Sequence, residues 1–195
     1  MIKGIVKQNH IKASTKKYIT SIITILFISI CLILLVKSNI NNIAEKEEIS
    51  ANNDKLIKEE YKKVIKYLKK DAEETYALSD INHDGVKELI IISGISEADK
   101  TIYCFTYAEA KAVYCGSTWS THSTYFEEEN ENFLIRLTYI QGIETLSHLL
   151  LENGKLKEEV VYNKDVSNSE QFEMSEKQKA IKFVDINDLS MIDEM

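Results

Sequence analysis

An uncharged apolar run near the N-terminus constrains this chain more than any other feature of its sequence. Residues 19–36 read ITSIITILFISICLILLV. As a helix rising about 1.5 Å per residue, they would extend roughly 27 Å, about the thickness of a bilayer core. Lys16 and Lys17 directly precede the run, and no acidic residue occurs before Lys37. The positive-inside bias therefore predicts a single-pass anchor with a cytoplasmic N-terminus and the rest of the chain outside.

Three other interpretations of this run remain open. A cleaved signal peptide should have a shorter apolar core and a small-x-small cleavage site, whereas this run ends in Leu-Leu-Val-Lys. A lipoprotein box at Cys31 would need a small residue at position 30, which is Ile30. A buried helix is the third. We favour an uncleaved signal anchor over all of them.

The anchor divides the chain into four predicted segments. Residues 1–18 form a basic cytoplasmic tail, 19–36 the transmembrane anchor, 37–53 a polar stalk, and 54–195 an extracytoplasmic domain. The part after Lys37 holds 18 basic and 31 acidic residues, a net charge of −13. Such a surface repels phosphate, so nucleic acid is not an expected partner.

The period of the apolar residues changes once within the exported part. From residue 54 to about 74 they recur at helical spacing, with charged residues on the opposite face. Seven segments with strand composition follow, at 89–92, 101–107, 111–115, 123–127, 133–140, 143–151 and 156–162. Turn signals separate them, the strongest being Asn153-Gly154. Ser175 and Gln178 have the spacing of a capping box, which predicts a short helix over 175–182.

These segments predict an α+β fold. The amphipathic helix would pack on an antiparallel meander sheet of six to seven strands, with the short helix at the C-terminus.

One short acidic loop carries the chemistry of the sequence. Residues 80–88 read DINHDGVKE, a D-x-N-x-D-G-x-x-E string. Oxygen donors at its positions 1, 3, 5, 7 and 9 can surround Ca²⁺, and glycine at position 6 permits the sharp turn. The predicted calcium ligands are Asp80, Asn82, Asp84, the carbonyl of Val86, and Glu88. Position 12, a bidentate Glu in an EF-hand, is Ile91, and strand residues replace the exiting helix, so a helix–loop–helix is not predicted.

The segment YALSDINHDGVKELIIISG resembles the loop-to-strand segment of many exported Gram-positive proteins. Similar strings occur in calcium-binding FG-GAP-like and dockerin-like segments. The resemblance covers about residues 55–163 and implies a calcium site at the five residues above. It also implies an N-terminal helix, a small antiparallel sheet, and a lipoprotein signal or membrane anchor, in proteins that often have no known activity.

A metal-free interpretation of the loop stays open beside the calcium site. Asx side chains can cap backbone N–H groups in a turn with Gly85 at positive φ, without any ion. A single loop that lacks the ligand at position 12 would bind weakly, at about 10⁻⁴ to 10⁻³ M. Such an ion would be structural.

Cys104 and Cys115 face each other if the intervening turn is centred on residues 109–110. They could then form a cross-strand disulfide or remain as two buried thiols. The four His show no zinc-site spacing, and neither Cys precedes a helix that would lower its pKa. A zinc centre and a Cys–His nucleophile are therefore not expected.

Two polar stretches complete the candidates. Residues 116–124 are rich in hydroxyls and contain Trp119, which suggests a ligand platform such as carbohydrate stacking, or simply a strand or loop with a buried Trp. Residues 127–131 are acidic and predict a solvated hairpin tip. We expect a non-enzymatic binding module that is anchored in the membrane through residues 19–36 and binds a cell-envelope or protein partner. The alternatives are a cell-envelope hydrolase and an accessory subunit of a membrane complex.

Overall fold

Strands dominate the part of the chain that the structure, a computed structural model, describes. The described residues are 32, 34–38, 52–69, 74–167 and 172–195. The chain divides into two units, Met1–Asn52 and Asn53–Met195. In the first unit, residues 32 and 34–38 are helical. The predicted basic tail and most of the predicted anchor and stalk lie outside the described residues.

None of the helices in the described ranges combines the length and the apolar character needed to cross a membrane.

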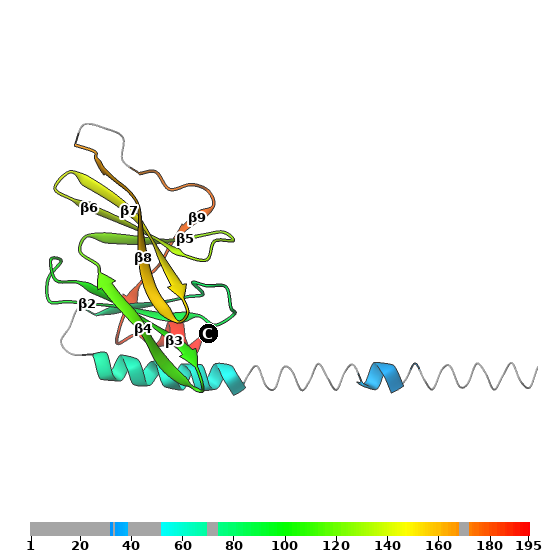
Figure 1. The fold of residues 1–195 in the computed structure, drawn as a ribbon. Coiled ribbons are helices and arrows are strands. Elements are labelled where there is room, and N and C mark those ends of the chain that lie inside the picture. Colours follow the sequence, from blue (N-terminus) through cyan, green and yellow to red (C-terminus); the bar gives the residue numbers. More distant parts are fainter. Residues whose placement is uncertain (1–31, 33, 39–51, 70–73, 168–171) are drawn as a thin grey trace, which may run out of the picture. The chain divides into compact units, whose positions relative to one another are not determined.

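The second unit contains one long helix, two antiparallel sheets and a short C-terminal helix (Figure 1). The long helix extends over residues 52–68, and all of it but its first residue belongs to this unit. The first sheet has the order β10-β1-β2-β3-β4, with β1 Thr75–Ser79, β2 Glu88–Ser93, β3 Thr101–Ala108, β4 Lys111–Trp119 and β10 Val184–Asp185. The second sheet has the order β8-β7-β6-β5-β9, with β5 Ser123–Glu128, β6 Leu134–Ile140, β7 Ile143–Glu152, β8 Lys155–Asp165 and β9 Gln178–Ala180. Helix α2 is Ser190–Asp193.

The predicted α+β fold with a single meander sheet is wrong. The strands divide into two five-stranded sheets, and β4 pairs with β3 only, while β5 pairs with β6 and β9. The change of sheet occurs at the link 120–122, where His122 has a φ of 46°. A residue in this left-handed region ends the extended conformation, so the chain leaves the first sheet instead of turning back along β4.

The predicted C-terminal helix over 175–182 is also wrong. The Ser175 N–H donates to Gln178 Oε1 at 3.0 Å, which is one contact of the expected capping box. However, the Gln178 N–H donates to the Ser175 carbonyl at 3.1 Å and closes a turn that leads into β9. β9 then pairs with residues 126–128 of β5. Strand pairing at an open sheet edge has overridden a weak local helix signal.

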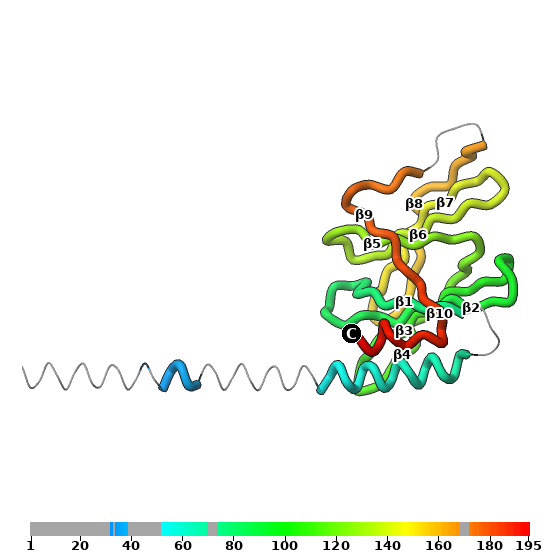
Figure 2. Tube along the Cα trace, turned by 180° about the vertical axis from the view of Figure 1, so that it is seen from behind, coloured from blue at the N-terminus to red at the C-terminus, as the bar shows by residue number. Residues whose placement is uncertain are grey.

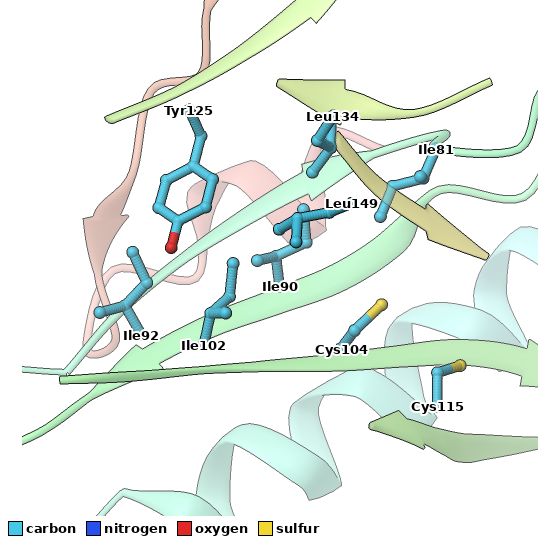
Figure 3. Close-up of a cluster of buried hydrophobic side chains, with 9 residues drawn as sticks. All are labelled: Ile81, Ile90, Ile92, Ile102, Cys104, Cys115, Tyr125, Leu134 and Leu149. Carbon is cyan, nitrogen blue, oxygen red and sulfur yellow. The ribbon is translucent and has the colours of Figure 1, made fainter. Parts of the chain in front are cut away.

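The first sheet is covered on both faces (Figure 2). On one face, Tyr61 and Ile65 of the long helix pack against Leu89 and Ile91. On the other, the alternating residues of β2 and β3 meet side chains of the second sheet, and Figure 3 shows this cluster: Ile81, Ile90, Ile92, Ile102, Cys104, Cys115, Tyr125, Leu134 and Leu149. Double coverage explains why residues 89–92 of β2 are an unbroken apolar run.

The outer face of the second sheet has a smaller apolar cluster. Phe126, Ile135 and Leu146 are buried there, and Phe172 from the C-terminal segment packs against them. The second unit therefore has a helix, a sheet and a second sheet in successive layers, and the calcium-type loop begins at the end of β1.

Candidate functional site

The loop 80–88 joins β1 to β2 and coils around its own backbone. The carboxylate of Asp80 accepts the N–H groups of Asp84 at 3.1 Å and Gly85 at 3.0 Å. The side-chain oxygen Oδ1 of Asn82 accepts the Asp84 N–H at 3.2 Å, and the Asp84 carboxylate accepts the Val86 N–H at 2.8 Å. Gly85 has a φ of 88°, as position 6 of the motif requires. Three predicted ligands thus surround one short stretch of chain.

These hydrogen bonds leave the loop able to hold a cation. A carboxylate oxygen has two lone pairs, so an oxygen that accepts one N–H can also coordinate an ion. Asp84 also accepts the side-chain amide of Asn82 at 2.9 Å. Asp80 and Asn82 are half-buried, and Asp84 is exposed. None of the ion pairs among the described residues involves Asp80, Asp84 or Glu88.

Glu88 lies beneath the loop and is fully buried. Its two oxygens accept the Ile81 N–H at 2.9 Å and the Thr106 hydroxyl at 3.0 Å. Burial, and to a lesser extent the charges of Asp84 and Asp80, raises the pKa of Glu88 to about 7, although both hydrogen bonds oppose the shift. Glu88 therefore anchors the loop to β3, and a water molecule would be needed for it to reach an ion from this position.

The long helix fixes the exit of the loop. Tyr61 is fully buried, and its hydroxyl donates to the Lys87 carbonyl at 2.7 Å. The loop is thus held by β3 on one side and by the helix on the other. Its position depends on the folded core.

The acidic tip of the β5–β6 hairpin faces the loop across a cleft of about 580 Å³. Ser79 donates its hydroxyl to Glu127 at 2.6 Å, and a ring nitrogen of His83 lies 2.8 Å from the Glu131 carbonyl oxygen. Lys177, directly before β9, and Lys179, within it, line the same cleft. The hairpin tip was predicted to be only a solvated turn, and no local sequence signal links it to a loop 40 residues earlier.

Comparisons with family models, curated proteins and solved structures find no match to this chain. The site is therefore interpreted from its own geometry.

The structure brings the side chains of three of the five predicted ligands to the backbone of one loop. Asp80, Asn82 and Asp84 converge, and Glu88 is turned into the core. Val86 contacts Asp84 through its N–H, whereas its predicted role as a ligand uses its carbonyl. In the described ranges, no three His, Cys, Asp or Glu side chains are grouped as ligands of a metal. The predicted calcium site would also use an amide and a backbone carbonyl, which such a grouping leaves out.

The two cysteines of the first sheet are buried and unbridged. The expected register holds at Phe105, which pairs with Tyr114, but a β-bulge follows and Cys104 pairs with Gly116. Cys115 is the extra residue of the bulge, so the predicted pairing of the two cysteines is wrong. The two thiols still interact, and this hydrogen bond together with burial raises the pKa of Cys104 well above its usual value.

We expect both thiols to be unreactive in the folded protein. In a Cys31→Ser background, iodoacetamide at pH 7.5 should leave Cys104 and Cys115 unmodified, because both side chains are buried and out of reach of the reagent, although the hydrogen bond with Cys104 lowers the pKa of Cys115. Unfolding in guanidinium chloride should expose two reactive thiols, counted by intact mass. A mass two hydrogens lower, with no labelling after unfolding, would instead reveal a disulfide.

The described histidines are engaged away from these thiols. His148 stacks on Phe133 with ring centroids 3.7 Å apart, and His122 lies 3.9 Å from Glu97. His83 contacts the Glu131 carbonyl. None of these contacts of the described histidines pairs one with Cys104 or Cys115 as a base beside a nucleophile.

Proposed function

We propose that the chain is a membrane-anchored, extracytoplasmic binding module whose loop 80–88 weakly binds a structural calcium ion. One observation carries the calcium part: three carboxylates, on Asp80, Asp84 and Glu88, lie in or beneath one loop without an ion-pair partner among the described residues. A divalent cation would compensate these charges. The anchoring part rests on the uncharged residues 19–36 and the lysines before them.

The position of the loop supports a structural role for the ion. The loop connects β1 to β2 and contacts the β5–β6 hairpin through Ser79 and His83. An ion bound there would fix an element of the first sheet against an element of the second. It would thereby stabilise the arrangement of the two sheets without taking part in a reaction.

Calcium titration tests this proposal. Isothermal calorimetry on the full chain should detect one site with a Kd of about 10⁻⁴ to 10⁻³ M. For a Kd of about 1 mM, 10 mM calcium should raise the unfolding free energy by about 1.4 kcal/mol, which thermal denaturation can measure. The variant Asp84→Ala should lose both effects.

The matched control is Glu59→Ala, which removes one exposed carboxylate from the long helix. This variant should bind calcium like the wild type. If calcium produces neither heat nor a thermal shift in the wild type, the loop is a metal-free Asx turn and the proposal is wrong. Equal loss in both variants would show a non-specific charge effect, and it would also contradict the proposal.

A further inference from the structure

An apolar groove lies between the long helix and the strands β3 and β4 of the first sheet. Its volume is about 420 Å³, and no residue of the loop 80–88 lines it. Its walls are almost entirely apolar or aromatic, and they include Val64, Tyr67, Leu68, Tyr103, Phe105 and Tyr114. The helix therefore leaves part of this face of β3 and β4 uncovered.

Four aromatic side chains form a patch on this side of the domain. Tyr103 pairs with Ile91, which packs against the long helix, so Tyr103 points to the same face of the sheet. Trp119 pairs with Thr101, two residues before Tyr103, and therefore also points to this face. What we call the aromatic patch consists of Tyr67, Tyr103, Tyr114 and Trp119.

The aromatic patch is open to solvent. The side chains of Tyr67, Tyr114 and Trp119 are 84%, 53% and 60% exposed, although a buried Trp was the simpler expectation from the sequence. Clustered exposed apolar side chains are typical of interaction surfaces. Tyrosine and tryptophan combine an apolar ring with one polar group, and both are enriched where a membrane meets water. The composition of the patch therefore suits a lipid surface.

The charges around the patch favour an anionic surface. Residues 52–69 contain six lysines and three acidic residues, a net charge of +3, whereas all residues after Lys37 together have a net charge of −13. Lys66 is exposed and takes part in none of the ion pairs of the described residues. Glu60 is the only acidic residue that lines the groove, and Lys63 compensates its charge at 2.5 Å. An anionic surface would attract this side of the domain and repel the others.

The predicted anchor keeps the domain close to such a surface. Residues 37–51 connect the predicted anchor to the long helix, and a chain of this length spans at most about 50 Å. A short connection gives the domain an effective concentration in the millimolar range at the bilayer. A weak attraction is then sufficient for docking.

We propose that the aromatic patch, together with Lys63 and Lys66, docks on the anionic lipid surface of the membrane in which the chain is anchored. The inference rests on the membrane-anchored part of the proposed function and adds the partner of this side of the domain. The aromatic rings lie at the level of the lipid headgroups, and the lysines contact their phosphates. The outer face of the second sheet then points away from the bilayer.

Quenching by labelled lipid tests the proposal directly, because Trp119 is the only tryptophan of the chain. The full chain is reconstituted in EGTA into vesicles of three parts phosphatidylcholine to one part phosphatidylglycerol that contain 5-doxyl phosphatidylcholine. The spin label should reduce the emission of Trp119 about twofold, because an indole at the headgroup level lies near it. Quenching should decrease in vesicles without phosphatidylglycerol and in 0.5 M NaCl, which screens the lysines.

Two pairs of variants localise the contact. Trp119→Tyr/Tyr139→Trp moves the indole to β6, where Tyr139 is 43% exposed and shares the outer face of the second sheet with Ile135. The tryptophan at position 139 should be quenched far less than Trp119. Lys66→Gln should weaken docking about fivefold, whereas Lys179→Gln, which removes an exposed charge from β9, should behave like the wild type. Circular dichroism verifies that the variants are folded.

Flotation of the vesicles separates this outcome from that of the anchor. If the chain floats with the vesicles but Trp119 is not quenched, docking is refuted and the anchor stands. If the chain does not float, the anchor is refuted, and quenching of the chain mixed with the same vesicles still decides the docking. Equal quenching at positions 119 and 139, or equal effects of the two lysine variants, would overturn the proposal. Calcium binding has no part in these measurements, since they are performed in EGTA.

Discussion

Replacing Leu149 with Ala should lower the free energy of unfolding by about 2–5 kcal/mol. Leu149 lies in β7 and is fully buried between the two sheets (Figure 3). It belongs to the same cluster as Ile90 and Ile102 of the first sheet and Leu134 of the second. Truncation removes apolar contacts on both sides and leaves a cavity that rigid strands cannot close.

Leu150→Ala is the matched control for this prediction. Leu150 is the next residue of β7, points to the opposite face and is only half-buried. Its truncation should lower stability by less than about 1 kcal/mol. Urea denaturation measures the stability of both variants, and an unchanged m-value would show that only stability has changed. Equal losses would contradict a face-to-face packing of the two sheets against Leu149.

The positions of the strands could be predicted from the sequence, but their partners could not. The seven predicted segments coincide with β2 to β8, because alternation and turn residues are local signals. The segment 75–79 was not predicted as a strand, although it is β1. Pairing depends on contacts between distant residues, and a meander was assumed where the chain changes sheets.

One feature of the sequence did contain information about the second sheet. Residues 89–92 are apolar without alternation, which requires both faces of β2 to be buried. The long helix covers the face of Leu89 and Ile91, so the face of Ile90 needed another layer. The second sheet supplies that layer. A count of buried faces would have favoured two sheets over one.

In the candidate site, too, the features set by neighbouring residues could be predicted, and those set by contacts between distant residues could not. The loop 80–88 was predicted from spacing alone, and Asp80, Asn82 and Asp84 do converge there. The burial of Glu88 and the neighbouring hairpin 127–131 could not be predicted, since both depend on how the two sheets pack. The exposure of Trp119 depends on the same packing.

Without calcium, the contribution of Glu88 to stability should fall as the pH rises. The pKa of Glu88 is about 7 in the folded protein against a usual value of 4.5, so the folded state binds its proton more tightly than the unfolded state. This contribution is fully present below about pH 4.5 and is lost as the pH rises through about 7. The shift corresponds to about 3 kcal/mol.

Glu88→Gln isolates this effect from the other titrating groups. Glutamine is neutral at every pH, yet its amide can accept the Ile81 N–H and donate to the Thr106 hydroxyl. In EGTA, the variant should gain stability relative to the wild type between pH 4.5 and 8, measured by urea denaturation at each pH. Glu59→Gln, on the exposed face of the long helix, should show no such trend.

Calcium should reduce the stability advantage of Glu88→Gln over the wild type at high pH. A bound cation favours the carboxylate form of Glu88, so 10 mM calcium at pH 8 should stabilise the wild type more than Glu88→Gln. A stability difference between the two proteins that does not change from pH 4.5 to 8 in EGTA would contradict the raised pKa of Glu88. If calcium leaves the stability difference between the two proteins unchanged, Glu88 does not interact with the ion. The loop would then bind calcium through Asp80, Asn82, Asp84 and the Val86 carbonyl.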